Sequence, residues 1–142
     1  MSEQDLSSSP APGLIRVTVV TPEATVLEAD GDSLVLPLFD GEIGVLANHA
    51  PMIGRLGYGE LRLKWGSDLT RLYVDGGFVQ VADNLVSVMT DRALPVDQVD
   101  AAAAQAKLDE ALSRKASGSD EIELRDKAVM RARGQIRVAA KS

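Results

Sequence analysis

Few side chains in this sequence have the chemistry of a catalytic or metal site, and those few lie close together. The single histidine is His49, and Asp40 and Glu42 come shortly before it. An imidazole beside a carboxylate is a general acid–base pair, so a hydrolase that uses these three residues is one function to consider. The simpler alternative is that the His49 ring bonds backbone groups and holds a turn. No second metal ligand stands near His49, and we expect neither a metal site nor a bound cofactor.

A second set of candidate residues is basic and lies near the end of the chain. Residues 125–142 contain six bases against one acid, Asp126. The arginines of this set are Arg125, Arg131, Arg133 and Arg137. They form either a solvated helix face beside an acidic domain or an arm that binds an acidic surface elsewhere. Exposed ion pairs contribute only about 0–1 kcal/mol each, so several of these arginines would have to act together.

Composition limits the classes of protein to which the chain can belong. Its 142 residues suit one compact domain with a small appendage, and 45% hydrophobic with 25% charged residues is an ordinary globular composition. No apolar run approaches the roughly 18 residues that cross a membrane. The first 13 residues contain no Lys or Arg, which argues against a secretory or transit peptide.

The absence of cysteine and the net charge exclude further classes. Without cysteine there are no disulfides, no thiolate catalysis and no cysteine-ligated zinc. A net charge of −6 argues against a nucleic-acid binder, because such proteins neutralise phosphates with Lys and Arg. These properties favour a cytoplasmic binding or structural protein over an enzyme.

Two unlike segments share the chain, and we place the boundary between them at Leu94–Pro95. All six prolines and ten of the twelve glycines lie at or before this point. Residues 1–94 carry a net charge of −7, whereas residues 95–142 carry +1 and are rich in good helix formers. We therefore expect a disordered segment at residues 1–13, a β domain at residues 14–94 and a helical segment at residues 95–142.

Short β-rich runs separated by turn residues fill the first segment. The candidate strands are residues 14–20, 25–29, 33–38, 43–46, 60–65, 70–74, 78–81 and 85–90. The interruptions include Gly57-Tyr58-Gly59 and Gly76-Gly77, whose glycines can adopt the positive φ of a turn. Strands this short, repeating about every 8–12 residues, predict a β-sandwich or a barrel.

The second segment predicts two helices joined by a short loop. Asp97 is a candidate N-cap for the first helix, and Asp100 lies near its positive end. A Ser-Gly-Ser loop precedes the second helix, which we expect to begin at Asp120. The apolar stripe of this antiparallel hairpin is mostly alanine and buries little area, while Gly134 costs the second helix about 1 kcal/mol. The hairpin should therefore be weakly held and able to move.

Two motifs in the β segment resemble a known family. Residues 41–52 read GEIGVLANHAPM, which resembles the G-E-x-G-(V/I)-L-x-x-H-A-P-(L/M) signature of the epsilon subunit of F-type ATP synthases. Residues 75–81 read DGGFVQV and look like the second signature of that family, with Gln80 where glutamate is usual. The resemblance covers about residues 14–140, with a β segment followed by a helical hairpin in the expected order.

The resemblance implies a mainly β protein with added α structure. The expected fold is a flattened ten-stranded β-sandwich followed by a C-terminal antiparallel two-helix hairpin. The sandwich would bind the gamma subunit with one face and the membrane c-ring with one end. The hairpin would fold against the sandwich or extend toward the alpha/beta catalytic head and inhibit ATP hydrolysis. The subunit would be non-catalytic and peripheral, held through the complex on the cytoplasmic face of a bacterial membrane, a plastid-encoded version being the alternative.

The resemblance also assigns roles to particular residues. It puts Glu42 and His49 at the loop that contacts the c-ring. The glycines and proline of the two motifs would serve backbone shape, with Gly76 and Gly77 forming a hairpin; these residues are Gly41, Gly44, Pro51, Gly76 and Gly77. The basic tail residues would meet an acidic surface on the catalytic beta subunits when the hairpin extends.

A departure from the family pattern concerns nucleotide binding. Some family members bind ATP through an (I/L)-D-x-x-R-A motif at the start of the first helix. This chain keeps the aspartate as Asp100 but has Ala103 in place of the arginine, and a methyl group cannot replace an arginine fork on phosphate oxygens. We expect no specific nucleotide site. The alternative of a different class is a free-standing β-sandwich ligand-binding or adaptor module with a helical tail.

Overall fold

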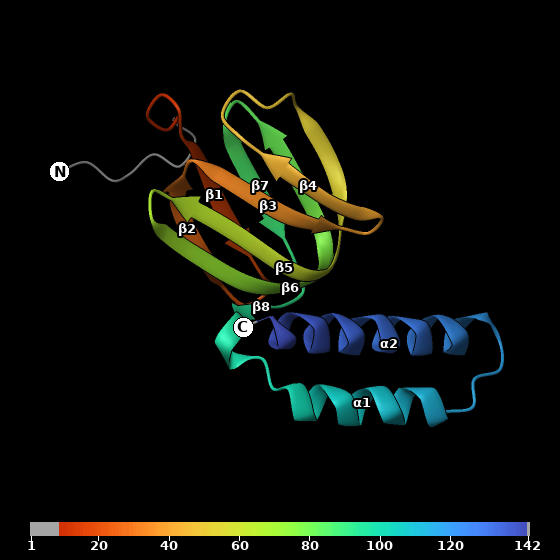
Figure 1. Cartoon of the computed structure of the whole chain (residues 1–142). Coiled ribbons are helices and arrows are strands. Elements are labelled where there is room, and N and C mark those ends of the chain that lie inside the picture. The colour runs from red at the N-terminus through yellow and green to blue at the C-terminus, as the bar shows by residue number, and fades with distance from the viewer. Residues whose placement is uncertain (1–8, 142) are drawn as a thin grey trace.

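The structure is a computed structural model that describes residues 9–141. Most of the segment predicted to be disordered, residues 1–8, therefore lies outside the described residues. Within them, eight strands precede the helices (Figure 1). The elements are β1 (Ile15–Val20), β2 (Thr25–Gly31), β3 (Ser33–Leu38), β4 (Gly41–Val45), β5 (Met52–Trp65), β6 (Asp68–Ala82), β7 (Leu85–Met89), β8 (Ala93–Pro95), the short 3-10 helix η1 (Val96–Gln98), α1 (Ala101–Ser113) and α2 (Ser119–Ala140).

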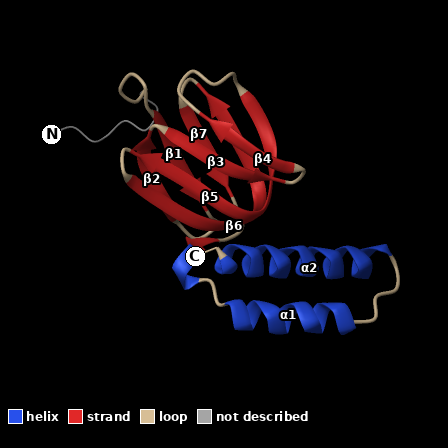
Figure 2. Ribbon diagram, in the orientation of Figure 1, coloured by secondary structure: helices blue, strands red, loops and turns tan. Residues whose placement is uncertain are grey.

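The strands form one mixed sheet that folds over on itself into two layers (Figure 2). Its order is β2-β1-β7-β6-β5-β3-β4, with β8 added to β6. The β1–β7 pair is parallel and the other pairs are antiparallel. Fifteen buried aliphatic residues lie in one cluster between the layers, all of them between Ile15 and Val88. The prediction of a β-sandwich followed by a helical hairpin is therefore confirmed.

The strand count differs from the expected ten because two long strands bend instead of ending. The sequence predicts breaks at Gly57-Tyr58-Gly59 and at Gly76-Gly77, but both lie inside β5 and β6, which have 14 and 15 residues. Gly77 pairs with Leu56 across the ladder, and a Cβ on Gly77 would overlap the carbonyl oxygen of Met89. These glycines therefore bend the sheet so that both strands serve its two layers, and the predicted Gly76-Gly77 hairpin is wrong.

Two smaller differences lie around the boundary between the segments. The predicted boundary at Leu94–Pro95 falls inside β8, a three-residue strand too short for its pattern to be recognised. The N-cap of α1 is Asp100, whose side chain accepts a hydrogen bond from the Ala103 amide at 3.0 Å. Asp97 instead lies in η1, because the buried Val96 next to it packs against the sandwich. The first helix therefore begins one short turn later than predicted.

The helices form an antiparallel hairpin, and α2 is the one that lies against the sheet (Figure 1). A second, smaller apolar cluster joins α2 to the sheet and consists of Tyr73 of β6, Val96 of η1 and Val138 of α2. Neither helix within residues 9–141 is long and apolar enough to cross a membrane.

We expect a fragment ending at Gln98 to fold without the hairpin. The whole main cluster lies between Ile15 and Val88, and β8 stays paired with β6 in this fragment. The fragment loses the cover that Val138 gives Tyr73, which lowers the free energy of unfolding by about 2 kcal/mol, while water replaces Arg131 at the Asp75 carboxylate. Urea unfolding followed by circular dichroism measures this, with the full chain as reference. A fragment without a cooperative transition would contradict the division into two parts.

Candidate functional site

The most distinctive constellation of side chains lies where α2 meets β5 and β6. Gly134 is the point of closest approach: a Cβ there would come within 2.5 Å of the Tyr58 carbonyl oxygen and 2.9 Å of the Tyr58 Cβ. The glycine that weakens the helix in isolation is thus the residue that lets α2 lie directly on β5. We call this contact the docking seam; its residues are Tyr58, Tyr73, Asp75, Arg131, Gly134, Arg137 and Val138.

A buried ion pair lies in the middle of the docking seam. The Arg131 Nε of α2 lies 2.9 Å from Oδ2 and 3.0 Å from Oδ1 of Asp75 in β6. The Asp75 side chain is 3% exposed, whereas that of Arg131 is 35% exposed. The Tyr73 hydroxyl donates a third hydrogen bond to Asp75 Oδ1 at 2.7 Å. One carboxylate therefore joins the sheet to the helix through a charged donor and a neutral one.

The ionisation of the neighbours of Asp75 suits this arrangement. Burial, together with the nearby Asp75 carboxylate, raises the pKa of Tyr73 far above its ordinary value, so its hydroxyl remains a donor. Burial lowers the pKa of Arg131, but the Asp75 charge and hydrogen bond, together with Tyr73 and Tyr58, outweigh burial, and the pKa of Arg131 is raised. Burial also raises the pKa of Tyr58. Arg131 therefore keeps its positive charge over the physiological pH range.

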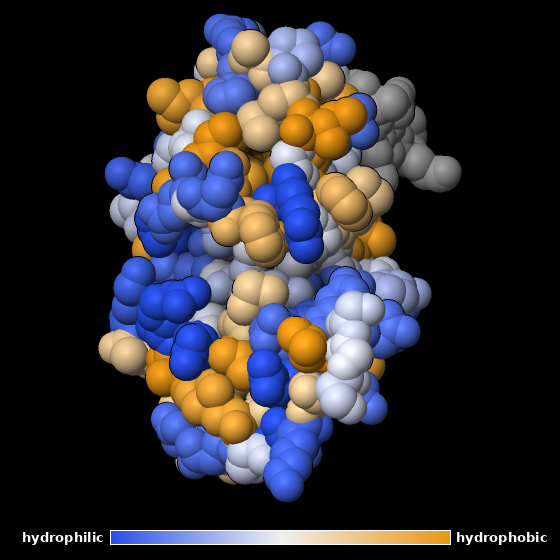
Figure 3. Space-filling model, turned by 90° about the vertical axis from the view of Figure 1, so that its right-hand side faces the viewer, coloured by the Kyte–Doolittle hydropathy of each residue, from blue (hydrophilic) through white to orange (hydrophobic). Residues whose placement is uncertain are grey.

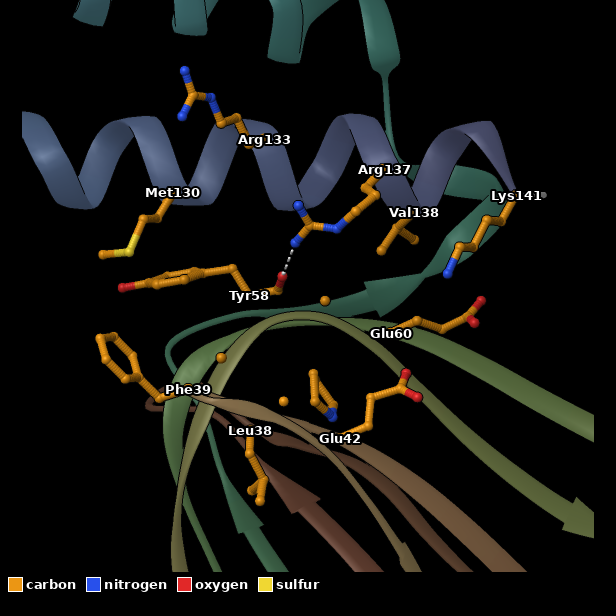
Figure 4. A pocket seen from close by; sticks show the side chains of 14 residues that line it. Leu38, Phe39, Glu42, Tyr58, Glu60, Met130, Arg133, Arg137, Val138 and Lys141 are labelled. Atoms are coloured by element: carbon orange, nitrogen blue, oxygen red, sulfur yellow. Dashed lines mark hydrogen bonds between the residues drawn. The ribbon is translucent and has the colours of Figure 1, made fainter.

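Two more contacts fasten the C-terminal half of α2. Arg137 Nη2 donates to the Tyr58 carbonyl oxygen at 3.2 Å (Figure 4). Arg71 Nη2 of β6 donates to the Lys141 carbonyl oxygen at 3.3 Å, which puts a cation at the negative end of the helix. Arg71 is itself held by Glu60, whose Oε2 accepts from Arg71 Nε at 2.6 Å. The sheet thus contacts α2 at its middle and at its end.

A groove of about 600 Å³ opens beside the seam under this half of α2. Its polar lining comes from the sandwich as Glu42 and Glu60 and from α2 as Arg133, Arg137 and Lys141. In Figure 4 the Arg133 side chain points away from Tyr58, while Lys141 extends toward Glu60. Figure 3, with the sandwich above and the hairpin below, shows polar side chains at the waist between the two parts. The helix face at this groove is basic and the sheet face acidic.

The structure does not bring the predicted acid–base residues together. Glu42 lies in this groove, 3.8 Å from Arg62. His49 lies in the loop after β4, at the end of the sandwich away from the helices in Figure 1, and its Nδ1 is 2.7 Å from the Ala50 carbonyl oxygen. Side chains of Asp, Glu and His form no group of three suited to a metal ion anywhere in residues 9–141. His49 thus has the backbone contact of a turn-holding residue.

The loop that contains His49 is itself tied to a neighbouring turn. The Asn48 amide donates to Asn84 Oδ1 at 2.6 Å, which joins the loop to the β6–β7 turn. Gly41 lies at the start of β4 with a φ of 154°, and Pro51 directly precedes β5. A Cβ on Gly44 would meet open space, so residues 9–141 impose no steric need for glycine there.

The four tail arginines have different surroundings. Arg131 is in the docking seam, and Arg137 reaches the Tyr58 carbonyl. Arg125 lies 3.7 Å from Asp126 of the same helix, and Arg133 is exposed. Sequence reasoning identified these arginines but missed Asp75, whose one visible signal is an acid within the apolar run from Leu72 to Val81.

Comparison with known proteins agrees with this architecture. A family model described as the beta-sandwich domain of the ATP synthase Delta/Epsilon chain matches residues 14–96. The ATP synthase epsilon chain of Rhodopirellula baltica is 52% identical over 125 residues, covering 88% of this chain and 98% of that relative. That of a Synechococcus strain is 39% identical over 109 residues, covering 77% of this chain and 80% of the relative.

Solved structures support the fold. A chain in the mitochondrial ATP synthase of Euglena gracilis superposes with a TM-score of 0.78 at 22% identity, covering 100% of this chain and 90% of that one. A chain in the central stalk and c-ring structure of the Tetrahymena thermophila enzyme superposes with a TM-score of 0.71 at 15% identity, covering 88% and 96%. Both contain the sandwich and the helical segment, since the alignments span nearly the whole of each chain.

Proposed function

This chain belongs to the epsilon-subunit family of the F-type ATP synthases, and on that premise we propose that it is a rotor subunit with two tasks. The first is to couple proton flow through the c-ring to ATP synthesis in the catalytic head. The second is to inhibit ATP hydrolysis through its C-terminal helices. It makes and breaks no covalent bonds itself.

The partners that we propose are the gamma subunit and the c-ring, with the alpha/beta head joining when the hairpin extends. The relatives are named ATP synthase epsilon chains, and one structural neighbour comes from a central stalk and c-ring assembly. We place the subunit on the cytoplasmic face of a bacterial plasma membrane, held there through the complex. Our proposal predicts that the fragment ending at Gln98 binds the gamma subunit. The alternative, a free-standing adaptor module, predicts that this fragment does not bind it.

The observation that carries the inhibitory role is the polar character of the docking seam. The buried residues of α2 are Ala132, Gly134 and Val138, of which Val138 alone has a sizeable apolar side chain. Burying a valine contributes about 2 kcal/mol, so the rest of the seam depends on hydrogen bonds and one ion pair. Groups of this kind are solvated readily by water, and α2 can leave the sandwich without exposing a large apolar surface. The released basic face then becomes available to acidic groups of the catalytic subunits.

We expect His49→Ala to lower proton-driven ATP synthesis in membranes that contain the complex. The loop between β4 and β5, which contains His49, lies at the end of the sandwich away from the helices, and this is the end that we propose to meet the c-ring (Figure 1). The His49 ring contacts only the exposed carbonyl of the adjacent Ala50 among the side-chain hydrogen bonds of the described residues, so the free energy of unfolding of the isolated subunit should change by no more than about 1 kcal/mol. The measurement is the synthesis rate at a fixed proton gradient.

Glu42→Ala is the companion variant, because the same c-ring contact is proposed for Glu42. The structure places this side chain beside Arg62 in the groove under α2, and not in the loop of His49. A fall in synthesis for both single variants, larger in the double variant, supports the proposed c-ring contact of both residues. Normal synthesis in the double variant would return His49 to its role in the turn.

A further inference from the structure

Two buried acidic residues lie in the described part of the sandwich, and they differ in where their cations come from. Glu60 pairs with Arg62 at 2.9 Å and with Arg71, and all three residues belong to the sheet. Asp75 pairs with Arg131, which belongs to α2. Departure of α2 therefore leaves the ion pairs of Glu60 intact and breaks the one that neutralises Asp75.

Both the backbone and the carboxylate of Asp75 are held by hydrogen bonds. Its backbone amide lies within hydrogen-bond distance of Thr90 Oγ1, at 2.9 Å, and of the Arg92 carbonyl oxygen, at 3.1 Å, which fixes the residue at the bend of β6. The hydroxyl of Tyr73, a fully buried residue of β6, donates a hydrogen bond to Asp75 Oδ1 from the sheet side. The remaining acceptor capacity of the carboxylate faces Arg131. Asp75 gives up its charge-assisted hydrogen bonds to Arg131 when α2 leaves, so the docked position of α2 is the one that Asp75 favours.

Arg131 has two competing uses. In the docked state its guanidinium is bound to Asp75, and about a third of the side chain is exposed. In the extended state of the proposed inhibitory mechanism, the same guanidinium would be part of the basic face that meets the catalytic subunits. One arginine cannot satisfy both carboxylate partners at once, since its fork is directed at one of them.

We propose that Asp75 is a latch that holds α2 docked by binding Arg131, and that Asp75 thereby limits inhibition by competing with the catalytic subunits for that arginine. The docking half of this inference stands on the contacts of the seam, and the inhibition half rests on the proposed function. The two ends of one ion pair then have opposite effects on hydrolysis. Loss of Asp75 frees α2 with its arginine intact, whereas loss of Arg131 frees α2 but weakens its grip on the catalytic head.

The first experiment measures docking in the isolated full-length subunit. Because the chain has no cysteine, Ser67→Cys and Leu124→Cys give two unique spin-label sites, one at the exposed β5–β6 turn and one on the exposed face of α2. Asp75→Asn should raise the ratio of released to docked subunits about tenfold, since a charge-assisted hydrogen bond is replaced by a neutral one. Asp30→Asn is the matched control, because Asp30 pairs with Arg16 within the sandwich at 2.8 Å. The control should leave the distance distribution unchanged.

The second experiment measures hydrolysis by the complex reassembled with each variant. The complex with Asp75→Asn should hydrolyse ATP more slowly than the wild-type complex. The complex with Arg131→Met should show no such decrease, although both variants release α2 in the spin-label measurement. Arg131 lies on the surface of the helix, so this variant tests the latch even if Asp75→Asn disturbs the sandwich. The double variant should release α2 no more than the stronger single one, because both changes break the same pair.

The outcomes separate the latch from the inhibitory function. If Asp75→Asn and Asp30→Asn give the same docked distance as wild type, the latch is overturned. Release of α2 in both Asp75→Asn and Arg131→Met with unchanged hydrolysis keeps the latch and overturns the proposed inhibition. A fall in hydrolysis of equal size in both variants overturns the competition for Arg131, since the arginine would then have no role beyond docking.

Discussion

Removing residues 120–142 should raise the rate of ATP hydrolysis by the assembled complex severalfold without reducing assembly. The deletion removes α2, and with it every tail arginine, but leaves the main apolar cluster of the sandwich untouched. The partner surfaces that we propose for gamma and the c-ring lie on the sandwich, so the truncated chain should still join the complex. Steady-state hydrolysis, normalised to the amount of epsilon chain bound, is the measurement. Equal rates for truncated and full-length complexes would leave the hairpin without an inhibitory role.

Replacing Arg131, Arg133 and Arg137 by alanine tests whether the basic face is responsible for this gain. Alanine favours the helix, so lost helicity cannot explain an effect. The seam makes the expected result more specific, because Arg131 and Arg137 also hold the docked state. The triple variant should release α2 and still raise hydrolysis, since a released helix without its charges binds acidic groups poorly. Raising the salt concentration should shrink its difference from wild type, because exposed charges are screened over about 8–10 Å at physiological salt.

The alternating and turn signals of the sequence predicted most of the sandwich, since they report local backbone preferences. β1, β2, β3 and β7 lie within two residues of their predicted bounds, and the order of sandwich and hairpin is as expected. The predicted breaks at Gly57-Tyr58-Gly59 and Gly76-Gly77 were wrong because glycine is common both in turns and at bends within a strand. Whether Gly76-Gly77 turns or bends depends on the ladder partner, and Leu56 is 21 positions away in the chain. The sequence did not predict β8 for a related reason: its three residues form a strand only because they pair with β6.

The docking seam could not be predicted because its residues come from distant parts of the chain. Asp75 and Arg131 are separated by 56 positions, and each has an ordinary local explanation: an acid beside a glycine bend and a base on a helix. Gly134 looked like a weakness of the second helix, because helix propensity counts the helix alone. Glycine is needed at this position because the Tyr58 carbonyl oxygen lies against the helix there, and no local sequence pattern predicts that contact. Resemblance to a family supplied the two-part architecture but not this contact.

Gly134→Leu should therefore separate helix formation from docking. Leucine raises helix propensity by about 1 kcal/mol over glycine, so the helical circular dichroism of the isolated subunit should stay equal or increase. The same side chain begins at a Cβ that would lie 2.5 Å from the Tyr58 carbonyl oxygen, a backbone atom that cannot move aside. Overpacking of this kind costs typically about 1–3 kcal/mol, which corresponds to a rise of about tenfold or more in the released state.

The readouts are the spin-label distance between Ser67→Cys and Leu124→Cys and the hydrolysis rate of the reassembled complex. Ala140→Leu is the matched control, because it adds a comparable side chain to the same helix at an exposed position. We expect the docked distance to disappear in Gly134→Leu alone, together with slower hydrolysis, since this variant keeps Arg131 and the whole basic face while α2 is free. Helicity and docking would then move in opposite directions in one variant, a result that a hairpin held by its own helix stability cannot produce. Persistence of the docked distance in Gly134→Leu would mean that α2 lies on the sandwich without the close contact at Tyr58, and would contradict the seam as the element that controls release.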